Sequence, residues 1–299
     1  MKYAIIDIGS NSIRLTVYRH DEEDNQVYIQ FKDKIMAGLA GHVEDGMLTE
    51  RGIKKACNAL KIYKRILGNL NIDRIYPFAT ASLRNIKNSA EAIAEIRLQT
   101  GYEVDVVSGE EEAKLDFIGA TQIINIDDGI LVDIGGGSTE IVIFQNKEIL
   151  EAFSMPVGSL NMYKKYVKSL LPTKFERKAI GKEVKKELEK LNLNIEKKYL
   201  NMCGVGGTVR ATRKLSMEFA QNEKVNKEVD IDDIKSVIKE LEGDEKETID
   251  KILQVIPERI HTIMPGIVIL NTVTKYFDTQ RIYVSSYGVR EGYLFKNVL

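Results

Sequence analysis

The chain has few of the residues that form common metal centres. Its 299 residues include only two cysteines and three histidines. Cys57 and Cys203 have no C-x-x-C pattern and no histidine cluster nearby, so they are interpreted as small buried residues in a reducing compartment. His20, His42 and His261 are scattered and match no metal or catalytic-base pattern. These absences argue against a zinc site.

The sequence also lacks a large charge excess and a long apolar run. Lys and Arg number 43 and Asp and Glu number 44, so the net charge of −1 excludes a globally basic nucleic-acid binder. The apolar stretch after Met1 ends at Asp7, which is too short for a signal segment or a membrane span. We therefore expect a cytoplasmic protein that binds neither nucleic acid nor membrane.

A short acidic, glycine-rich element occurs twice, about one domain length apart. The first copy is DIGSNS at residues 7–12, and the second is DIGGGST at residues 133–139. Each copy follows an apolar run that predicts a buried strand and precedes a second β-rich run. Glycine lets the backbone approach a ligand, and consecutive N–H groups bind anions. The repeat therefore predicts a pair of phosphate-binding hairpins.

The repeat predicts an α/β protein built from two similar domains. In each half, three strands are followed by helices and further strands. We expect an N-terminal domain over residues 1–124 and a C-terminal domain over residues 125–299, each long enough for its own core. A final helix is expected at about residues 288–299.

Capping residues and composition indicate several helices. Thr49 opens a helix that Gly68 closes, and Asn88 resembles the start of a capping box. The Lys- and Glu-rich segments 178–198 and 222–250 have the composition of solvated amphipathic helices rather than polyanion sites.

A third glycine turn, at residues 204–208, follows a predicted strand and opens a helix. Together the three turns offer backbone donors for phosphate. Asp7 and Asp133, each at a strand end, are candidate contacts of a divalent ion bound through water. Glu140 lies on an otherwise apolar strand, where it is either an exposed strand residue or a further acid of this site.

Three consecutive acids, Glu110, Glu111 and Glu112, open another predicted helix. Acids are favourable at a helix N-terminus, but one that is held near phosphate can also act as a general base. Helical periodicity alone does not choose among the three. Arg84 follows a strand in a small polar turn, where it is either a surface residue or a bidentate phosphate ligand, and Arg14 is a weaker candidate.

Taken in order, these motifs resemble those of a known family over nearly the whole chain. They are D-I-G-S-N-S, the turn that ends at Arg84, S-G-x-E-E-A, D-I-G-G-G-S-T-E, G-V-G-G-T and S-x-x-G-V-R-E-G. The pattern resembles the exopolyphosphatase/guanosine pentaphosphate phosphohydrolase (Ppx/GppA) family. The resemblance implies two actin-like domains of ribonuclease H-like topology, with the active site in the cleft between them, and metal-dependent hydrolysis of a terminal phosphate.

The resemblance also implies roles for individual residues. Glu112 matches the catalytic base, and Arg84 joins it in the catalytic set. Mg²⁺ or another hard divalent ion is implied at Asp133 and Glu140, with Asp7 as a water-mediated contact. The implied phosphate-binding residues are Ser10, Asn11, Ser12, Gly135, Gly136, Gly137, Ser138, Gly206, Gly207 and Thr208.

The sequence departs from the family pattern at two places. The order Thr80-Ala81-Ser82 stands where T-S-A is usual, and His261 follows Arg259 and Ile260 where an acidic residue is often found. A contact that depends on that carboxylate is therefore in question. Long family members add a helical C-terminal region, so a chain of 299 residues is expected to be the short two-domain form. By analogy with the family, we expect a homodimer. The last helix is expected to pack against the first domain.

The leading hypothesis is an exopolyphosphatase that releases the terminal phosphate of inorganic polyphosphate. Its near alternative is a guanosine pentaphosphate 5'-phosphohydrolase, because both substrates end in a phosphoanhydride. A more distant alternative is an actin-like ATP-binding kinase or ATPase, against which the S-G-x-E-E-A motif argues. A catalytically inactive sensor is the last alternative, and the retained acids weigh against it.

Overall fold

The computed structural model describes residues 1–193, 198–219 and 228–299. Two compact units make up the chain, Met1–Gly109 and Glu110–Leu299, and each is described by itself. The division falls ahead of helix α4 (Gly109–Thr121). The functional domain boundary after residue 124 stays a prediction.

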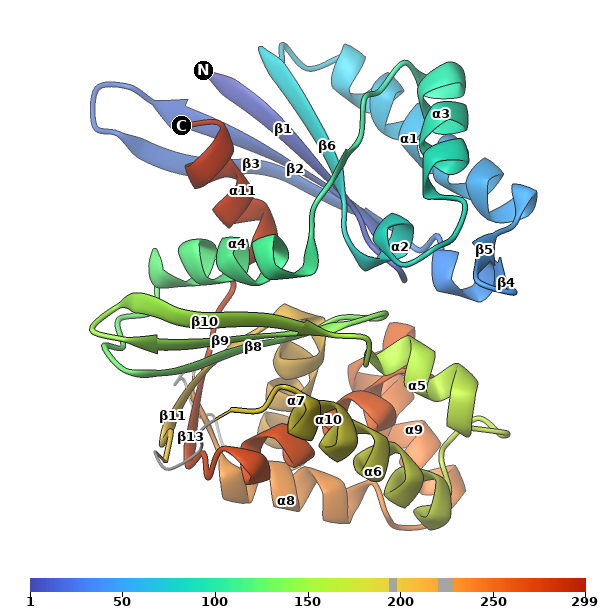
Figure 1. Cartoon of the computed structure of the whole chain (residues 1–299), viewed down its shortest axis with the longest axis vertical. Coiled ribbons are helices and arrows are strands. Elements are labelled where there is room, and N and C mark those ends of the chain that lie inside the picture. Colours follow the sequence, from blue (N-terminus) through green and yellow to red (C-terminus); the bar gives the residue numbers. More distant parts are fainter. Residues whose placement is uncertain (194–197, 220–227) are drawn as a thin grey trace. The chain divides into compact units, whose positions relative to one another are not determined.

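The first unit is built on a five-stranded sheet with the order β3-β2-β1-β6-β7. β1, β2 and β3 form an antiparallel meander, whereas β6 and β7 continue the sheet in parallel from β1. Helices α1 and α3 cover one face (Figure 1). The elements of the sheet and its helices are β1 (Lys2–Ile8), β2 (Ile13–Asp21), β3 (Gln26–Ile35), β6 (Arg74–Ala79), β7 (Asp105–Val106), α1 (Glu50–Gly68) and α3 (Ser89–Thr100). Shorter elements are η1 (Leu39–His42), β4 (Val43–Glu44), β5 (Met47–Leu48) and α2 (Ala81–Arg84).

Capping in the first unit agrees with the sequence in part. The Thr49 side chain accepts a hydrogen bond from the Gly52 backbone at the start of α1, as predicted. Gly68 is the last helical residue rather than the cap, which is Asn69. The predicted capping box at Asn88 is wrong, because the Asn88 amide bonds the backbone N–H and C=O of Leu48 instead.

The second unit repeats this architecture with one added edge strand. Its sheet has the order β10-β9-β8-β11-β13-β12, in which β8, β9 and β10 form the antiparallel meander and β11 and β13 run parallel to β8. The strands are β8 (Gly129–Ile134), β9 (Thr139–Gln145), β10 (Glu148–Met155), β11 (Asn201–Val205), β12 (Glu228–Asp230) and β13 (Arg281–Val284). The shared strand order confirms the predicted α/β class with two actin-like, ribonuclease H-like domains.

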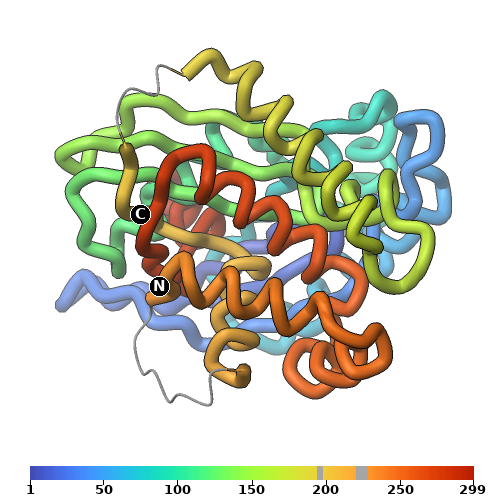
Figure 2. Tube along the Cα trace, turned by 90° about the horizontal axis from the view of Figure 1, so that it is seen from below, coloured from blue at the N-terminus to red at the C-terminus, as the bar shows by residue number. Residues whose placement is uncertain are grey.

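Alternation along the strands of the second unit separates two apolar layers. Ile130 and Val132 point into the larger core, which most of the helices cover, while Leu131 faces α4. α6 and α10 run side by side in the larger layer (Figure 2). The helices of this layer are α5 (Ser159–Tyr166), α6 (Lys174–Lys190), α7 (Gly206–Phe219), α8 (Ile231–Glu240), α9 (Glu245–Val255) and α10 (Ile263–Tyr276), with η2 (Pro257–Arg259) before α10.

The lysine-rich segments differ from the sequence expectation in detail. The first forms α6 but ends at Lys190, and residues 194–197 lie outside the described part of the chain. In the second, residues 222–227 lie outside it as well, and the rest forms β12, α8 and α9 instead of one helix. None of the helices in the described ranges has the length and apolar character needed to cross a bilayer.

The final helix, α11 (Val289–Asn297), packs against α4 with backbone close to backbone. A Cβ on Gly292 would lie 1.8 Å from the Leu115 carbonyl oxygen, and one on Gly119 would lie 2.2 Å from the Gly288 carbonyl oxygen. Both helices belong to the second unit, on the side of its sheet opposite the large helical layer (Figure 1). Their contact holds α4 in place over the sheet.

Candidate functional site

The two repeated glycine turns have the same backbone geometry. The Gly9 N–H donates to the Ser12 carbonyl oxygen at 3.1 Å, and the Gly135 N–H donates to the Ser138 carbonyl oxygen at 3.0 Å. In both units the turn joins the first two strands of the meander. The sequence repeat is therefore a repeat of local structure, at the end of the strand that carries the aspartate.

Helix α5 supports the glycine turn of the second unit. The Ser159 and Leu160 N–H groups donate to the carbonyl oxygens of Gly135 and Gly136, each at 2.9 Å. A Cβ on Gly158 would lie 2.5 Å from the Gly136 carbonyl group, so only glycine allows this approach. The turn is consequently fixed by backbone contacts before any ligand binds.

The third glycine turn lies beside Asp133. Gly206 has a φ of +82°, and a Cβ there would lie 1.9 Å from Asp133 Oδ1. The Thr208 hydroxyl donates to the Ile134 carbonyl oxygen at 3.0 Å, which ties this turn to the strand of Asp133. Two segments that the sequence analysis predicted separately thus meet in one place.

Arg259 is a residue at this turn to which the sequence analysis gave no role. A Cβ on Gly207 would lie 1.7 Å from Arg259 Nη2, so the guanidinium group rests against the glycine backbone. Arg259 ends the short helix η2, far from the glycine turns in sequence. In the sequence, Arg259 was named only as part of the segment that ends at His261, and that segment did not indicate a position beside Gly207.

Glu140 lies directly opposite Asp133 in the antiparallel pairing of β8 and β9. The Glu140 side chain is 1% exposed, and the Ser154 hydroxyl donates to its Oε1 at 2.7 Å. The reading of Glu140 as an exposed strand residue is therefore wrong. Two carboxylates directly opposite each other repel unless a cation or a proton lies between them.

Helix α4 brings further acids to the same face of this sheet. Ala113 and Phe117 pack on the layer that contains Leu131. Leu131 and Asp133 point to the same face because side chains alternate along a strand. Glu112 directly precedes Ala113 on α4 and is only 8% exposed.

The three consecutive acids, among which helical periodicity did not choose, have different surroundings in the structure. Glu110 forms an ion pair with Lys114 at 2.5 Å, and Glu111 forms one with Lys296 at 2.7 Å. Glu112 is the buried member of the three. Its role as the catalytic base stays a prediction.

Asp116 is a second residue without a predicted role. It lies one helical turn after Glu112 and is completely buried. Burial raises the pKa of the Asp116 carboxyl well above its usual value, and the charges of Asp133, Glu112 and Glu140 raise it further. Four acids of the second unit therefore lie close enough to influence one another.

The predicted residues of the first unit form a group of their own. Asp7 is buried at the strand end, and Arg14 Nε donates to the Ser12 hydroxyl at 3.2 Å. The carbonyl oxygens of Ser10 and Asn11 accept hydrogen bonds from residues 38–40, so the turn is fixed on that side.

Arg84 ends α2 and donates to the Val107 carbonyl oxygen at 3.0 Å. This contact turns the guanidinium toward the end of β7 within the first unit. A shared active site between Asp7 or Arg84 and the acids of the second unit stays a prediction.

Other polar groups in the described residues do not join the acids of the second unit. No three Asp, Glu, His or Cys side chains in the described ranges are placed to hold a metal ion directly. His261, at the position where the family often has an acid, lies with Nδ1 3.1 Å from the Tyr163 hydroxyl. Lys168 lies beyond the end of α5, so it does not share that helix with Lys164 and Lys165.

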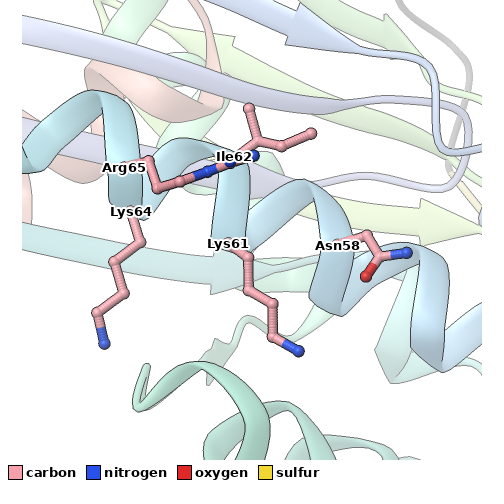
Figure 3. Close-up of a pocket in the computed structure, with 5 residues that line it drawn as sticks. All are labelled: Asn58, Lys61, Ile62, Lys64 and Arg65. Atoms are coloured by element: carbon pink, nitrogen blue, oxygen red, sulfur yellow. The ribbon is translucent and has the colours of Figure 1, made fainter.

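A cavity of about 690 Å³ lies along α1, away from the glycine turns in the sequence. Figure 3 shows that Lys61 and Lys64 extend from the same side of this helix. Lys61 donates to the Gln99 side chain at 2.9 Å, and Lys64 donates to the Thr100 carbonyl oxygen at 2.7 Å. These contacts join α1 to the C-terminal end of α3, where cations are favourable. The lysines thus have a structural role. The cavity is lined by Asn58, Lys61, Ile62, Lys64 and Arg65.

Comparison with known proteins identifies the relatives of the chain. A guanosine-5'-triphosphate,3'-diphosphate pyrophosphatase of Vibrio cholerae is 27% identical over 301 residues, which cover 99% of this chain and 59% of the relative. The chain spans about half the length of the curated relatives it matches, 44% of one and 59% of another.

Two crystal structures share the whole fold. An Aquifex aeolicus member of the Ppx/GppA protein family has 28% identity and a TM-score of 0.80, with 100% of this chain and 97% of that chain covered. An exopolyphosphatase from Cytophaga hutchinsonii has 23% identity and a TM-score of 0.88, with 99% of this chain and 97% of that chain covered. At this identity the similarity shows the fold alone. The model of the Ppx/GppA phosphatase family matches residues 16–299, and the chain therefore belongs to the Ppx/GppA phosphatase family.

Proposed function

We propose that the chain is an exopolyphosphatase, which releases the terminal phosphate of inorganic polyphosphate by attack of water. The observation that carries this proposal is the buried position of Glu112, whose charge acts on Asp116 together with the charges of Asp133 and Glu140 of the same unit. A carboxylate that is held near a bound phosphate can accept the proton of the attacking water. Membership of a phosphatase family supports the same reaction class.

The proposed reaction needs one base and a set of donors. Glu112 removes a proton from water, the water oxygen bonds to the terminal phosphorus, and the bridging P–O bond breaks. The shortened chain leaves with the electron pair of that bond. Positioning and charge stabilisation supply most of the catalysis in phosphoryl transfer. The donors proposed for this purpose are the backbone amides of the three glycine turns, Arg84 and Arg259.

A divalent ion fits the acids of the second unit. Asp133 and Glu140 are paired hard oxygen ligands, and Asp116 adds a buried carboxyl group without a hydrogen-bond partner among the described residues. Mg²⁺ commonly binds through one or two carboxylates and keeps several waters, so the absence of three direct ligands in the described ranges is compatible with it. When bound, such an ion neutralises charge that develops on the phosphate oxygens. Asp133 and Glu140 would hold it, with Asp7 as a proposed contact through water.

Guanosine pentaphosphate is the second candidate substrate. A relative that matches 99% of this chain is named as a guanosine-5'-triphosphate,3'-diphosphate pyrophosphatase. Its 5' end presents the same phosphoanhydride to Glu112. The more distant possibility, a kinase or ATPase, requires an acceptor or an adenosine pocket, and the buried Glu112 favours water as the acceptor. We further propose a cytoplasmic homodimer that acts on neither nucleic acid nor membrane.

The test is phosphate release from a panel of substrates with and without Mg²⁺. Polyphosphate, guanosine pentaphosphate and ATP would each be incubated with the purified chain, and free phosphate measured over time. Polyphosphate is expected to give the highest kcat/KM, with release abolished by EDTA and restored by Mg²⁺. A higher kcat/KM for guanosine pentaphosphate would replace the substrate assignment, and no metal-dependent release from any of them would reject the hydrolase.

A further inference from the structure

Asp116 is a buried acid for which packing gives no reason. It is 0% exposed, and neither of its carboxylate oxygens has a hydrogen-bond partner among the described residues. Leaving a buried polar group unpaired costs about 1–3 kcal/mol, and more when the group is charged. A neutral or apolar side chain of similar size would make the isolated fold more stable.

Asp116 is enclosed by α4 and by the start of α11. On α4 it has apolar neighbours, Ala113 and Phe117, which pack against the sheet. The N-terminus of α11 closes one side, since a Cβ on Gly288 would lie 3.0 Å from Asp116 Oδ1. The backbone N–H of Val289 favours the charged form, as the weakest of the main influences on the pKa of Asp116, but it makes no hydrogen bond to either carboxylate oxygen.

Negative charges dominate the electrostatic environment of Asp116. After burial, the main influences on its pKa are Asp133, Glu112 and Glu140, in that order. No cationic side chain is among them. A buried carboxyl group with unused acceptor oxygens, close enough to three further acids to be influenced by their charges, is typical of a site that is completed by a cation.

We propose that Asp116 is a positioning residue for a divalent ion at Asp133 and Glu140, and that it accepts a hydrogen bond from a water molecule on that ion. This inference rests on the proposed function, because it requires the ion. A role through water is consistent with the absence of three direct ligands in the described ranges. Outer-sphere acceptors of this kind fix the hydration shell of Mg²⁺ and thereby its affinity.

Two substitutions separate the proposed role from a purely structural one. Asp116→Leu removes the charge and both acceptor oxygens, whereas Asp116→Asn removes the charge and keeps one acceptor oxygen. Both variants are expected to raise the melting temperature of the metal-free protein, because they remove an unpaired buried carboxyl group. If the leucine variant fails to fold, the asparagine variant, which has the same shape, remains as the test.

The measurement is the binding of Mn²⁺ to the full chain, by electron paramagnetic resonance and by calorimetry. The expected result is a loss of affinity of about 10- to 100-fold for Asp116→Leu, with a smaller loss for Asp116→Asn. The matched control is Glu110→Gln, which removes one negative charge from the exposed side of the same helix and is expected to bind as wild type. Wild-type affinity in both Asp116 variants would overturn the inference.

A further variant separates this inference from the proposed function. Asp133→Asn is expected to lose Mn²⁺ binding, because it removes a proposed direct ligand. If Asp133→Asn binds poorly while both Asp116 variants bind normally, only the role of Asp116 is rejected. If Asp133→Asn binds like wild type, or if wild type binds no Mn²⁺, the proposed metal site fails and the inference fails with it.

Discussion

Asp133 on β8 lies directly opposite Glu140 on β9. The equivalent pair in the first unit is Asp7 opposite Arg14. The two units therefore share the aspartate but differ in its partner, which is a carboxylate in one and a guanidinium in the other. The register of the first unit thus sets an acid opposite a base, and that of the second unit sets an acid opposite an acid. A cation between two carboxylates lowers their repulsion, which is why the proposed ion is placed at the second pair.

Replacement of Glu112 tests the proposed base. Glu112→Gln keeps the size of the side chain but cannot accept a proton at neutral pH, so kcat is expected to fall by about 10²- to 10⁴-fold. KM and the melting temperature should change little. Steady-state phosphate release measures the effect. Glu111→Gln, which breaks only the ion pair with Lys296, is the control, and equal rates in the two variants would reject the assignment.

Gly206 is expected to accept no side chain. Gly206→Ala would place a methyl group 1.9 Å from Asp133 Oδ1 at a φ of +82°, which costs on the order of 1–3 kcal/mol in backbone strain and displaces the carboxylate. Thermal unfolding and Mn²⁺ binding should both weaken. Gly181→Ala, in α6 with its nearest atoms at 3.6 Å, is expected to stabilise by about 0.5–1 kcal/mol. Normal Mn²⁺ affinity in Gly206→Ala would contradict the close contact.

The contact between α4 and α11 is expected to control the position of Glu112. Gly292→Ala would bring a methyl group 1.8 Å from the Leu115 carbonyl oxygen, so the two helices must separate at a cost of about 1–3 kcal/mol. Stability measured by urea unfolding and kcat should both fall. Gly243→Ala, with only ordinary contacts, is the matched control. Unchanged kcat in a destabilised Gly292→Ala would show that α4 keeps its place without α11.

Cys203 is expected to be unreactive in the folded protein. Burial, with a smaller contribution from the charge of Asp116, raises the pKa of its thiol to about 12. The thiolate is the reactive form, so a raised pKa lowers reactivity at pH 8. Burial also raises the pKa of the Cys57 thiol. Labelling with a disulfide reagent should therefore be slow without urea and complete in urea, and rapid labelling of the folded chain would contradict the burial of both residues.

Local patterns in the sequence predicted the elements that depend on local physics. The two glycine turns, the strands beside them and the Thr49 cap were predicted because glycine, alternating apolar residues and threonine each act within a few residues. The error at Asn88 has a different origin, since its partner Leu48 is 40 residues away. A capping motif in the sequence does not exclude a distant competitor for the same side chain.

The site was predictable in its glycines and in part of its acids. Glu140 and Glu112 became assignable only through the family resemblance, because their burial depends on β10 and on packing of α4 over the sheet. Asp116 and Arg259 gave no local signal. Asp116 lies near Gly288 and Arg259 lies near Gly207, and only the tertiary structure brings these residues together.

If water activated by Glu112 attacks a terminal phosphate, an oxygen atom of the solvent is incorporated into the product. Polyphosphate and Mg²⁺ would be incubated with the chain in water enriched in ¹⁸O, and the released phosphate analysed by mass spectrometry. The released phosphate is expected to carry one ¹⁸O atom, and Glu112→Gln is expected to lower the rate of its release by orders of magnitude. Release without ¹⁸O, or an equal rate in the variant, would contradict this mechanism.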